Sequence, residues 1–368
     1  MSRPTPERSW STVASNVLKR SLGLRRGQSV LFDTHAETLQ PAELLSVEAR
    51  RQGIRPVILC VPEDFYATQT RTTPSNANAI SPVEVAALQA CDGYVYIPPS
   101  LENLQRREEL PLRHRRATYR RSAQWNQELL RRSVPSVYLL DATVTRSAAT
   151  QYDVNFSAWR RESSRASSVD PRVLQRAARP LARQLQRGRR VTIDHPNGTH
   201  LELALVGRPP ILDDGMVDAD DRQAGRIWTT IPSGLLTVAV EEGFAEGHWF
   251  SNRPSRHRRG AIRRMGWTFR KGRLVHYEIG EGRSIFEANY RSAGAERNRP
   301  ALVSVGLNSE IRNFPLAEDQ ERGVVTLYVG HNDDFGGRTR GSFREYALLR
   351  GADLTVDGRP LLRAGRWV

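Results

Sequence analysis

Residues 330–337 (GHNDDFGG) are a first candidate for chemistry, because glycines bracket polar side chains directly after an apolar run. This pattern predicts a sharp loop at the end of a strand, where sites of α/β proteins commonly lie. The imidazole of His331 and the amide of Asn332 can bind peptide backbone, and an imidazole can also act as a general acid or base. The segment is therefore a candidate ligand-binding loop.

Residues 213–221 form a second polar segment, whose aspartates are dense enough to suggest a cation site. Their spacing does not match an EF-hand loop, so we expect an exposed acidic turn. The sequence has no His-Glu-x-x-His pattern, no Gly-x-Ser-x-Gly elbow and no phosphate-binding loop. Two cysteines, Cys60 and Cys91, cannot form a four-thiolate zinc site. We therefore expect neither a metal nor another cofactor.

The chain of 368 residues has 55 basic and 40 acidic side chains, a formal charge of +15, and 53 of the basic residues are arginines. Residues 106–190 hold 20 arginines and seven acids (+13), and residues 253–273 hold nine basic residues and no acid (+9), which leaves −7 elsewhere. Such segments attract anionic partners without choosing among them. Because no recognisable nucleic-acid-binding module accompanies them, an acidic peptide or protein is favoured over nucleic acid.

Apolar runs in the first half predict short strands at residues 29–33, 55–60, 93–97 and 136–140. Helical spacing predicts helices over 12–22 and 37–52, and Ser81-Pro82 predicts the start of a third helix that ends at Ala90. Strands that alternate with helices indicate a mainly parallel sheet. No apolar run approaches the ~18 residues of a membrane-spanning helix, and no secretory leader is apparent, so a soluble cytoplasmic protein is expected.

The second half is richer in strands. After a helix over 171–186, a hairpin is predicted at 191–205 with its turn at Pro196-Asn-Gly198, and further strands are expected around 237–240, 266–269, 274–278, 301–305, 324–329 and 354–356. The Ser-rich stretch 163–170 is predicted to be a linker. The fold class is therefore α/β: an N-terminal, mainly parallel α/β domain over residues 1–165 and a β-rich α+β domain over residues 166–368.

A series of short segments resembles the metallo-aminopeptidases of the aminopeptidase T type and the related 2,5-dihydroxypyridine dioxygenases. These segments are 27–32, 193–201, 231–234, 240–247, 306–308, 330–337 and 352–358. They follow the order and spacing of that family over most of the chain. The resemblance implies an aminopeptidase T-like fold and makes a homodimer or heterodimer plausible.

That family holds divalent metals with carboxylates and histidines, and the resemblance places the corresponding positions at Leu235, Leu302, Thr326, Arg344 and Tyr346. A one-residue shift of the alignment would put Glu345 at one of them. Leucines offer no metal-binding atom, and an arginine would repel a cation by about 4 kcal/mol per unit-charge pair at 4 Å. We therefore expect neither metal-dependent hydrolysis nor iron-dependent oxygenation.

A family scaffold without its metal ligands suggests a non-catalytic peptide-binding protein, and the chain resembles the metal-free proteins of ribosomal peptide natural-product pathways of the crocagin type. That resemblance implies that it presents a precursor peptide to a tailoring enzyme. Arg344 would anchor a carboxylate or a carbonyl, Tyr346 and Trp249 would supply apolar contact, and the loop residues His331 and Asn332 would bind peptide backbone. The two arginine-rich segments would steer an acidic leader peptide or a partner enzyme.

Two alternatives remain open from the sequence. The first is an enzyme with a relocated, metal-independent site, a peptide hydrolase or cyclase that uses Glu345, His331 or Tyr346 as acid or base, or else a divergent aminopeptidase or dioxygenase. The second, nucleic-acid binding through the arginine-rich segments, predicts affinity that falls steeply with salt.

Overall fold

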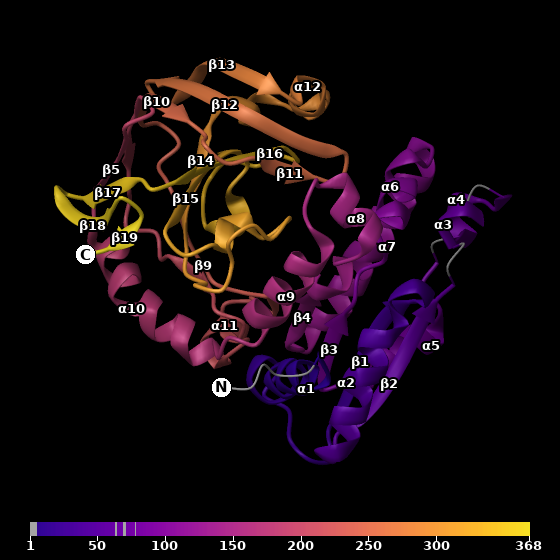
Figure 1. The fold of residues 1–368 in the computed structure, drawn as a ribbon. Coiled ribbons are helices and arrows are strands. Elements are labelled where there is room, and N and C mark those ends of the chain that lie inside the picture. The colour runs from indigo at the N-terminus through magenta and orange to yellow at the C-terminus, as the bar shows by residue number, and fades with distance from the viewer. Residues whose placement is uncertain (1–5, 63–64, 69–70, 78) are drawn as a thin grey trace. The chain divides into compact units, whose positions relative to one another are not determined.

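The computed structural model describes residues 6–368 except 63–64, 69–70 and 78, and the chain forms two compact units (Figure 1). Unit 1 is Met1–Pro171 with Gly215–Ser233, and unit 2 is Arg172–Asp214 with Gly234–Val368. The predicted domain boundary near residue 165 therefore does not account for residues 215–233, which also belong to unit 1. Residues 215–233 return to unit 1 because their strand pairs in parallel with the strand Ser136–Leu139 of the first sheet.

Unit 1 is a parallel five-stranded sheet with helices, as the alternating pattern predicts. Its strands, in sheet order, are β2 (Arg55–Val61), β1 (Ser29–His35), β3 (Gly93–Tyr96), β4 (Ser136–Leu139) and β8 (Trp228–Ile231). Its helices are α1 (Pro6–Asn16), α2 (Leu39–Arg51), α3 (Phe65–Thr68), α4 (Pro74–Ala77), α5 (Pro82–Ala90), α6 (Leu101–Glu109), α7 (Leu112–Arg131), α8 (Arg146–Gln151), α9 (Phe156–Ser167) and α11 (Ala219–Gln223). The apolar runs of β1, β3 and β4 are buried on both faces of the sheet, with Phe32 enclosed on one face and Leu31 on the other, whereas the edge strand β2 is partly exposed.

Two local predictions in unit 1 have opposite outcomes. Helix α5 begins as predicted, because the Ser81 hydroxyl accepts a hydrogen bond from the Glu84 backbone N–H at 3.1 Å and the Glu84 carboxylate accepts one from the Ser81 N–H. The predicted Ser-rich linker is wrong over its first half. There α9 continues to Ser167, because Ser163 and Ser167 are small enough to be buried on its inner face.

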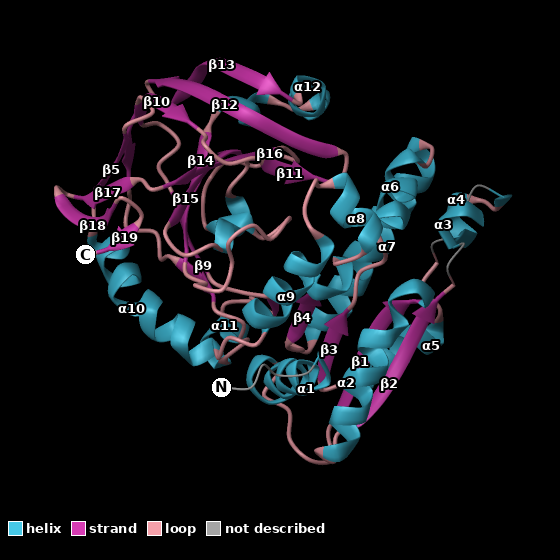
Figure 2. Ribbon diagram, viewed as in Figure 1, coloured by secondary structure: helices cyan, strands magenta, loops and turns pink. Residues whose placement is uncertain are grey.

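Unit 2 contains two antiparallel sheets and has more strand than helix (Figure 2). The nine-stranded sheet contains β5 (Arg190–His195), β6 (Thr199–Ala204), β10 (Ala245–Phe250), β11 (Ser255–His257), β12 (Gly260–Arg270), β13 (Arg273–Glu281), β17 (Asp353–Val356), β18 (Arg359–Arg363) and β19 (Arg366–Trp367). The five-stranded sheet has the order β16 (Arg344–Arg350), β15 (Val324–Gly330), β14 (Pro300–Gly306), β9 (Leu235–Ala239) and β7 (Ile211–Asp213). The helices of this unit are α10 (Pro171–Arg187) and α12 (Arg283–Ser292).

The predicted fold class, a parallel α/β domain followed by a β-rich part, is confirmed. The predicted hairpin is β5–β6, with His195 opposite Thr199 across the turn. No helix in the described part of the chain is long and apolar enough to cross a membrane.

Candidate functional site

The candidate site lies on one face of the five-stranded sheet in unit 2. Tyr346, Tyr328 and Leu302 are neighbours in the register of β16, β15 and β14. Thr326 lies two residues from Tyr328 on β15, so its side chain points to the same face. Three of the five positions that the resemblance assigns to metal ligands, at Leu302, Thr326 and Tyr346, therefore share one face.

The other two positions lie at the ends of strands. Leu235 opens β9 and pairs with Gly306, which is four residues from Leu302 along β14. Arg344 opens β16 and pairs with Gly330, where the glycine-rich loop begins. By the same alternation Arg344, two residues from Tyr346, lies on this face beside the other three, whereas Leu235 lies four residues along the sheet from Leu302.

Leu302, at a predicted carboxylate position, is part of a small apolar cluster. It is 1% exposed and packs with Ala239 and Ala301. The partly buried rings of Tyr328 and Phe335 pack against these three residues. An aliphatic side chain has no lone pair to offer a metal, and the enclosed Leu302 instead packs in the protein interior.

The Arg344 side chain is used inside the protein. Its Nε donates to the backbone oxygen of His331 at 2.9 Å, and its Nη2 donates to His331 Nδ1 at 3.1 Å. Nη2 also bonds to the carboxylate of Asp334, and the guanidinium lies 5.2 Å from the centre of the Phe335 ring. Arg344 thus holds the glycine-rich loop against β16, and anchoring a ligand carboxylate would require it to leave these partners.

Asn332 is fully buried and also stabilises the loop. Its Nδ2 donates to Glu242 Oε1 at 2.9 Å and to the backbone oxygen of Ala301 at 3.2 Å, while its Oδ1 accepts from the Thr339 N–H at 2.9 Å. A Cβ atom on Gly337 would lie 2.0 Å from the Asn332 side chain, so this close approach requires glycine there. The amide of Asn332 is therefore committed within the protein, where the sequence predicts a contact with peptide.

Trp249 does not reach this face. It lies on β10 of the nine-stranded sheet, opposite Trp267 of β12, and its side chain is 0% exposed. A fully enclosed indole cannot supply the predicted contact with a ligand. Of the predicted binding residues, His331, Arg344 and Tyr346 keep partial exposure.

Two tyrosines dominate the face, and their hydroxyls are both hydrogen-bonded. The Tyr328 hydroxyl donates to Asp319 Oδ2 at 2.9 Å, and the Tyr346 hydroxyl donates to the backbone oxygen of Arg256 at 2.8 Å. Their ring centres are 6.0 Å apart. Burial, reinforced by nearby carboxylates, raises the pKa of both phenols well above 10 and keeps them neutral. We call Arg256, Glu318, Asp319, Tyr328 and Tyr346 the tyrosine cluster.

The tyrosine cluster contains a buried ion pair between Arg256 and Glu318. Arg256 Nη1 lies 2.8 Å from Glu318 Oε1, and their side chains are 5% and 2% exposed. Burial raises the pKa of Glu318 to about 7, although the Arg256 guanidinium opposes this shift. Burial likewise raises the pKa of Asp319, against the hydrogen bond from Tyr328. No sequence motif marks these residues, because a short 3₁₀ turn, Glu318–Gln320, brings the acids to the sheet.

A histidine stands beside the tyrosine cluster. His257 Nε2 lies 3.1 Å from Glu345 Oε1, and the Glu345 side chain is 1% exposed. The His257 ring centre is 5.4 Å from that of Tyr346. A carboxylate that orients an imidazole is a common arrangement for acid–base chemistry. Glu345 is a predicted acid–base candidate, whereas no sequence pattern singles out His257, which lies among the arginines of residues 253–273.

A divalent metal does not fit the tyrosine cluster. Such an ion needs several deprotonated carboxylates or neutral imidazoles that converge on it, but here Glu318 is paired with an arginine and the phenols are neutral. Over the described residues, one group of three such donors lies within 4.8 Å, and it consists of His331, Asp333 and Asp334. Arg344 already bonds two of the three, so its positive charge takes the place of a cation.

Comparisons with known proteins place the fold. No family model and no curated protein matches the sequence. Among solved structures, wild-type AmpT (aminopeptidase T) from Thermus thermophilus matches with a TM-score of 0.75 and 16% identity over 99% of this chain and 100% of that chain. The 2,5-dihydroxypyridine dioxygenase from Pseudomonas putida KT2440 matches with a TM-score of 0.65 and 15% identity over 99% and 98%. The chain therefore has an aminopeptidase T-like fold.

Proposed function

We propose that this protein is a non-catalytic peptide-binding protein on an aminopeptidase T-like scaffold, which presents a precursor peptide to tailoring enzymes of peptide natural-product biosynthesis. The observation that carries the proposal is the chemistry of the sheet face, where apolar Leu302 and neutral Tyr346 occupy two positions that the resemblance assigns to metal ligands, with neutral Tyr328 between them. Tyrosine offers a large apolar ring with a polar end, and such rings are enriched where proteins bind peptides and other proteins.

The binding test uses a mixture of synthetic peptides of random sequence. Immobilised protein should retain a subset, which mass spectrometry identifies. The Tyr346 hydroxyl donates to the Arg256 carbonyl, but its oxygen can still accept a hydrogen bond from a peptide N–H, so Tyr346→Phe should weaken the binding of a retained peptide by about three- to tenfold. Tyr119→Phe, at a 63%-exposed tyrosine of unit 1, is the matched control and should change nothing. Retention of no peptide by the wild-type protein would refute the proposal.

A metal test addresses the enzyme of the same fold. The purified protein should carry no stoichiometric zinc, cobalt or iron and should not hydrolyse aminoacyl nitroanilides with those metals added, because donors are missing at Leu302 and Leu235. Stoichiometric metal together with turnover would show that a divergent aminopeptidase or dioxygenase is the better interpretation.

The second candidate function is a metal-independent peptide hydrolase or cyclase. The contact between His257 and Glu345 beside Tyr346 favours it, because these groups could exchange a proton with a bound peptide. Retained peptides would then give, on incubation, two fragments whose masses sum to that of the peptide plus one water in hydrolysis, or one product lighter by one water in cyclisation. His257→Gln should abolish that change while binding persists. Unchanged peptide masses would contradict the hydrolase or cyclase function and would favour peptide binding without catalysis.

A further inference from the structure

The outer face of α10 carries a stripe of arginines. Four of them recur at intervals of three or four residues, so they share one side of the helix, and all four are exposed. The stripe consists of Arg176, Arg179, Arg183 and Arg187. The opposite side of the helix buries Leu174, Ala178, Leu181 and Leu185. No acidic residue lies within the helix, so nothing on α10 itself neutralises the stripe.

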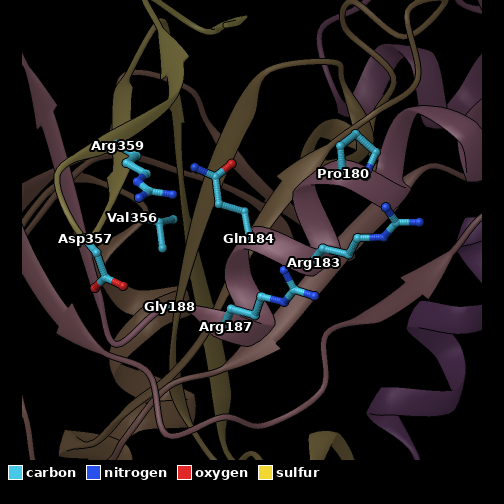
Figure 3. A pocket seen from close by; sticks show the side chains of 8 residues that line it. All are labelled: Pro180, Arg183, Gln184, Arg187, Gly188, Val356, Asp357 and Arg359. Atoms are coloured by element: carbon cyan, nitrogen blue, oxygen red, sulfur yellow. The ribbon is translucent and has the colours of Figure 1, made fainter.

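The stripe ends in a pocket of about 490 Å³. Arg183, Gln184 and Arg187 of α10 line one side, and Val356 and Arg359 at the β17–β18 turn line the other (Figure 3). Gln184 extends between the two sides in this view. Pro180 and Val356 add apolar surface to the wall. The pocket thus combines three guanidinium groups, an amide and an apolar wall.

The pocket is electropositive. Among the residues that the structure describes, no carboxylate lies within 4.0 Å of the guanidinium nitrogens of Arg183, Arg187 or Arg359. The one acid in the lining, Asp357, accepts hydrogen bonds from the backbone N–H groups of Arg189 and Arg190 at 3.1 and 2.9 Å. Three positive charges therefore outweigh this carboxylate and the partial charge of about −0.5 at the helix C-terminus.

We propose that this pocket and the arginine stripe form a binding site for an acidic peptide segment, with one carboxylate held between Arg183, Arg187 and Arg359. Planar guanidinium groups match carboxylates with paired hydrogen bonds. Neighbouring arginines of the stripe are about 4.5–6 Å apart along the helix axis, close to the about 6.7 Å between alternate side chains of an extended peptide. The site specifies an acidic peptide as the ligand of the proposed peptide-binding function, and this inference rests on that function.

Nucleic acid is the less favoured occupant of this site. Proteins that bind single strands stack bases on aromatic rings, and none of the residues lining the pocket or forming the stripe is aromatic. The apolar wall at Pro180 and Val356 instead suits an aliphatic side chain next to the carboxylate.

The test measures binding of a fluorescein-labelled hexaglutamate peptide by anisotropy at low salt. The triple variant Arg183→Gln, Arg187→Gln, Arg359→Gln should bind it about tenfold more weakly than the wild-type protein. The matched control removes three exposed arginines from α7, through Arg113→Gln, Arg116→Gln and Arg120→Gln, and so loses the same charge. It should weaken binding by less than about twofold.

Three results would overturn the site. Equal weakening by both triple variants would show that net charge alone attracts the peptide. No binding of hexaglutamate by the wild-type protein would exclude an acidic-peptide site. Tighter binding of an oligothymidylate that the pocket variant abolishes would assign the pocket to nucleic acid. If peptides retained from the random mixture bind the pocket variant unchanged, this site fails while the peptide-binding function stands.

Discussion

The two units of the molecule accommodate buried acids in different ways. In unit 1, Asp33 accepts a hydrogen bond from the neutral Tyr94 hydroxyl at 2.6 Å, and Asp141 accepts one from the Ser163 hydroxyl. Burial dominates both sites and raises the pKa of Asp33 to about 6 and that of Asp141 to about 7. These carboxyl groups are therefore protonated at higher pH than an exposed aspartate is.

In unit 2, arginines pair with two of the acids, whereas Asp319 accepts a hydrogen bond from Tyr328 as Asp33 does from Tyr94. Glu318 faces Arg256, and Glu242 faces Arg208 at 2.9 Å. Although burial alone would raise the pKa of Glu242, the Arg208 guanidinium and hydrogen bonds from the loop lower it to about 2. The number of arginines therefore does not indicate how many can bind a ligand. Arg256 and Arg208 form ion pairs within unit 2, whereas the arginines of the α10 stripe are exposed. Three predictions test this contrast.

Removing Arg256 should have the largest effect. Arg256→Met leaves Glu318 as an unpaired buried acid and should lower the free energy of unfolding by about 3–5 kcal/mol. Chemical denaturation at neutral pH measures the change. The Arg51–Glu48 pair provides the matched control, since Arg51 is 69% exposed and Arg51→Met should cost less than about 1 kcal/mol.

A double variant sharpens this result. If the cost comes from the unpaired acid, Arg256→Met combined with Glu318→Leu should be more stable than Arg256→Met alone, because no buried charge remains. A double variant as unstable as the sum of two independent losses would show that the pair contributes through packing instead.

Asp141 should make the stability of unit 1 depend on pH. Its pKa is about 7 in the folded state and near 3.8 when exposed, so its contribution is fully present below pH 3.8 and is lost as pH rises through 7. Asp141→Asn keeps an oxygen for the Ser163 hydroxyl and cannot ionise. It should match the wild-type stability near pH 4 and exceed it by about 2–4 kcal/mol at pH 8.

Denaturation curves at the two pH values measure this prediction. The exposed Asp153 is the control, and Asp153→Asn should show the same small difference from wild type at both. An Asp141→Asn protein that is less stable than wild type at pH 8 would indicate that the carboxylate is ionised and paired in the folded state.

The sequence predicted local structure well where one segment determines it. The apolar runs that become β1 to β4 and the Ser81 cap of α5 need no distant partner. The linker prediction failed because polarity alone does not reveal that Ser163 and Ser167 face inward. Periodicity within a segment therefore carries the fold class, but burial of small polar residues depends on what packs against them.

The candidate site was harder to predict, because its contacts join segments far apart in the chain. The resemblance identified Tyr346 and Leu302, which do share a sheet face. It does not indicate that Arg256 pairs with Glu318, 62 residues away. Nor does it indicate that the Arg344 guanidinium bonds to the carboxylate of Asp334. For this reason the sequence predicts ligand contacts for Arg344 and Asn332, whereas both side chains bind partners inside the protein.

Substitution of Asn332 should have the smallest effect. It tests whether Arg208 alone keeps Glu242, the partner of Asn332, ionised. Asn332→Ala leaves the Thr339 N–H without its partner and removes one of the two hydrogen bonds to the Ala301 carbonyl, which keeps the N–H of Val240, so it should cost about 1–3 kcal/mol. Because Glu242 keeps Arg208, its pKa should stay below its ordinary value, so the variant should still lose stability as pH falls from 4.5 toward 2. Asn76→Ala, at an exposed asparagine of unit 1, should be neutral. A variant whose stability no longer falls over that pH range would show that the amide, rather than the arginine, holds Glu242 ionised.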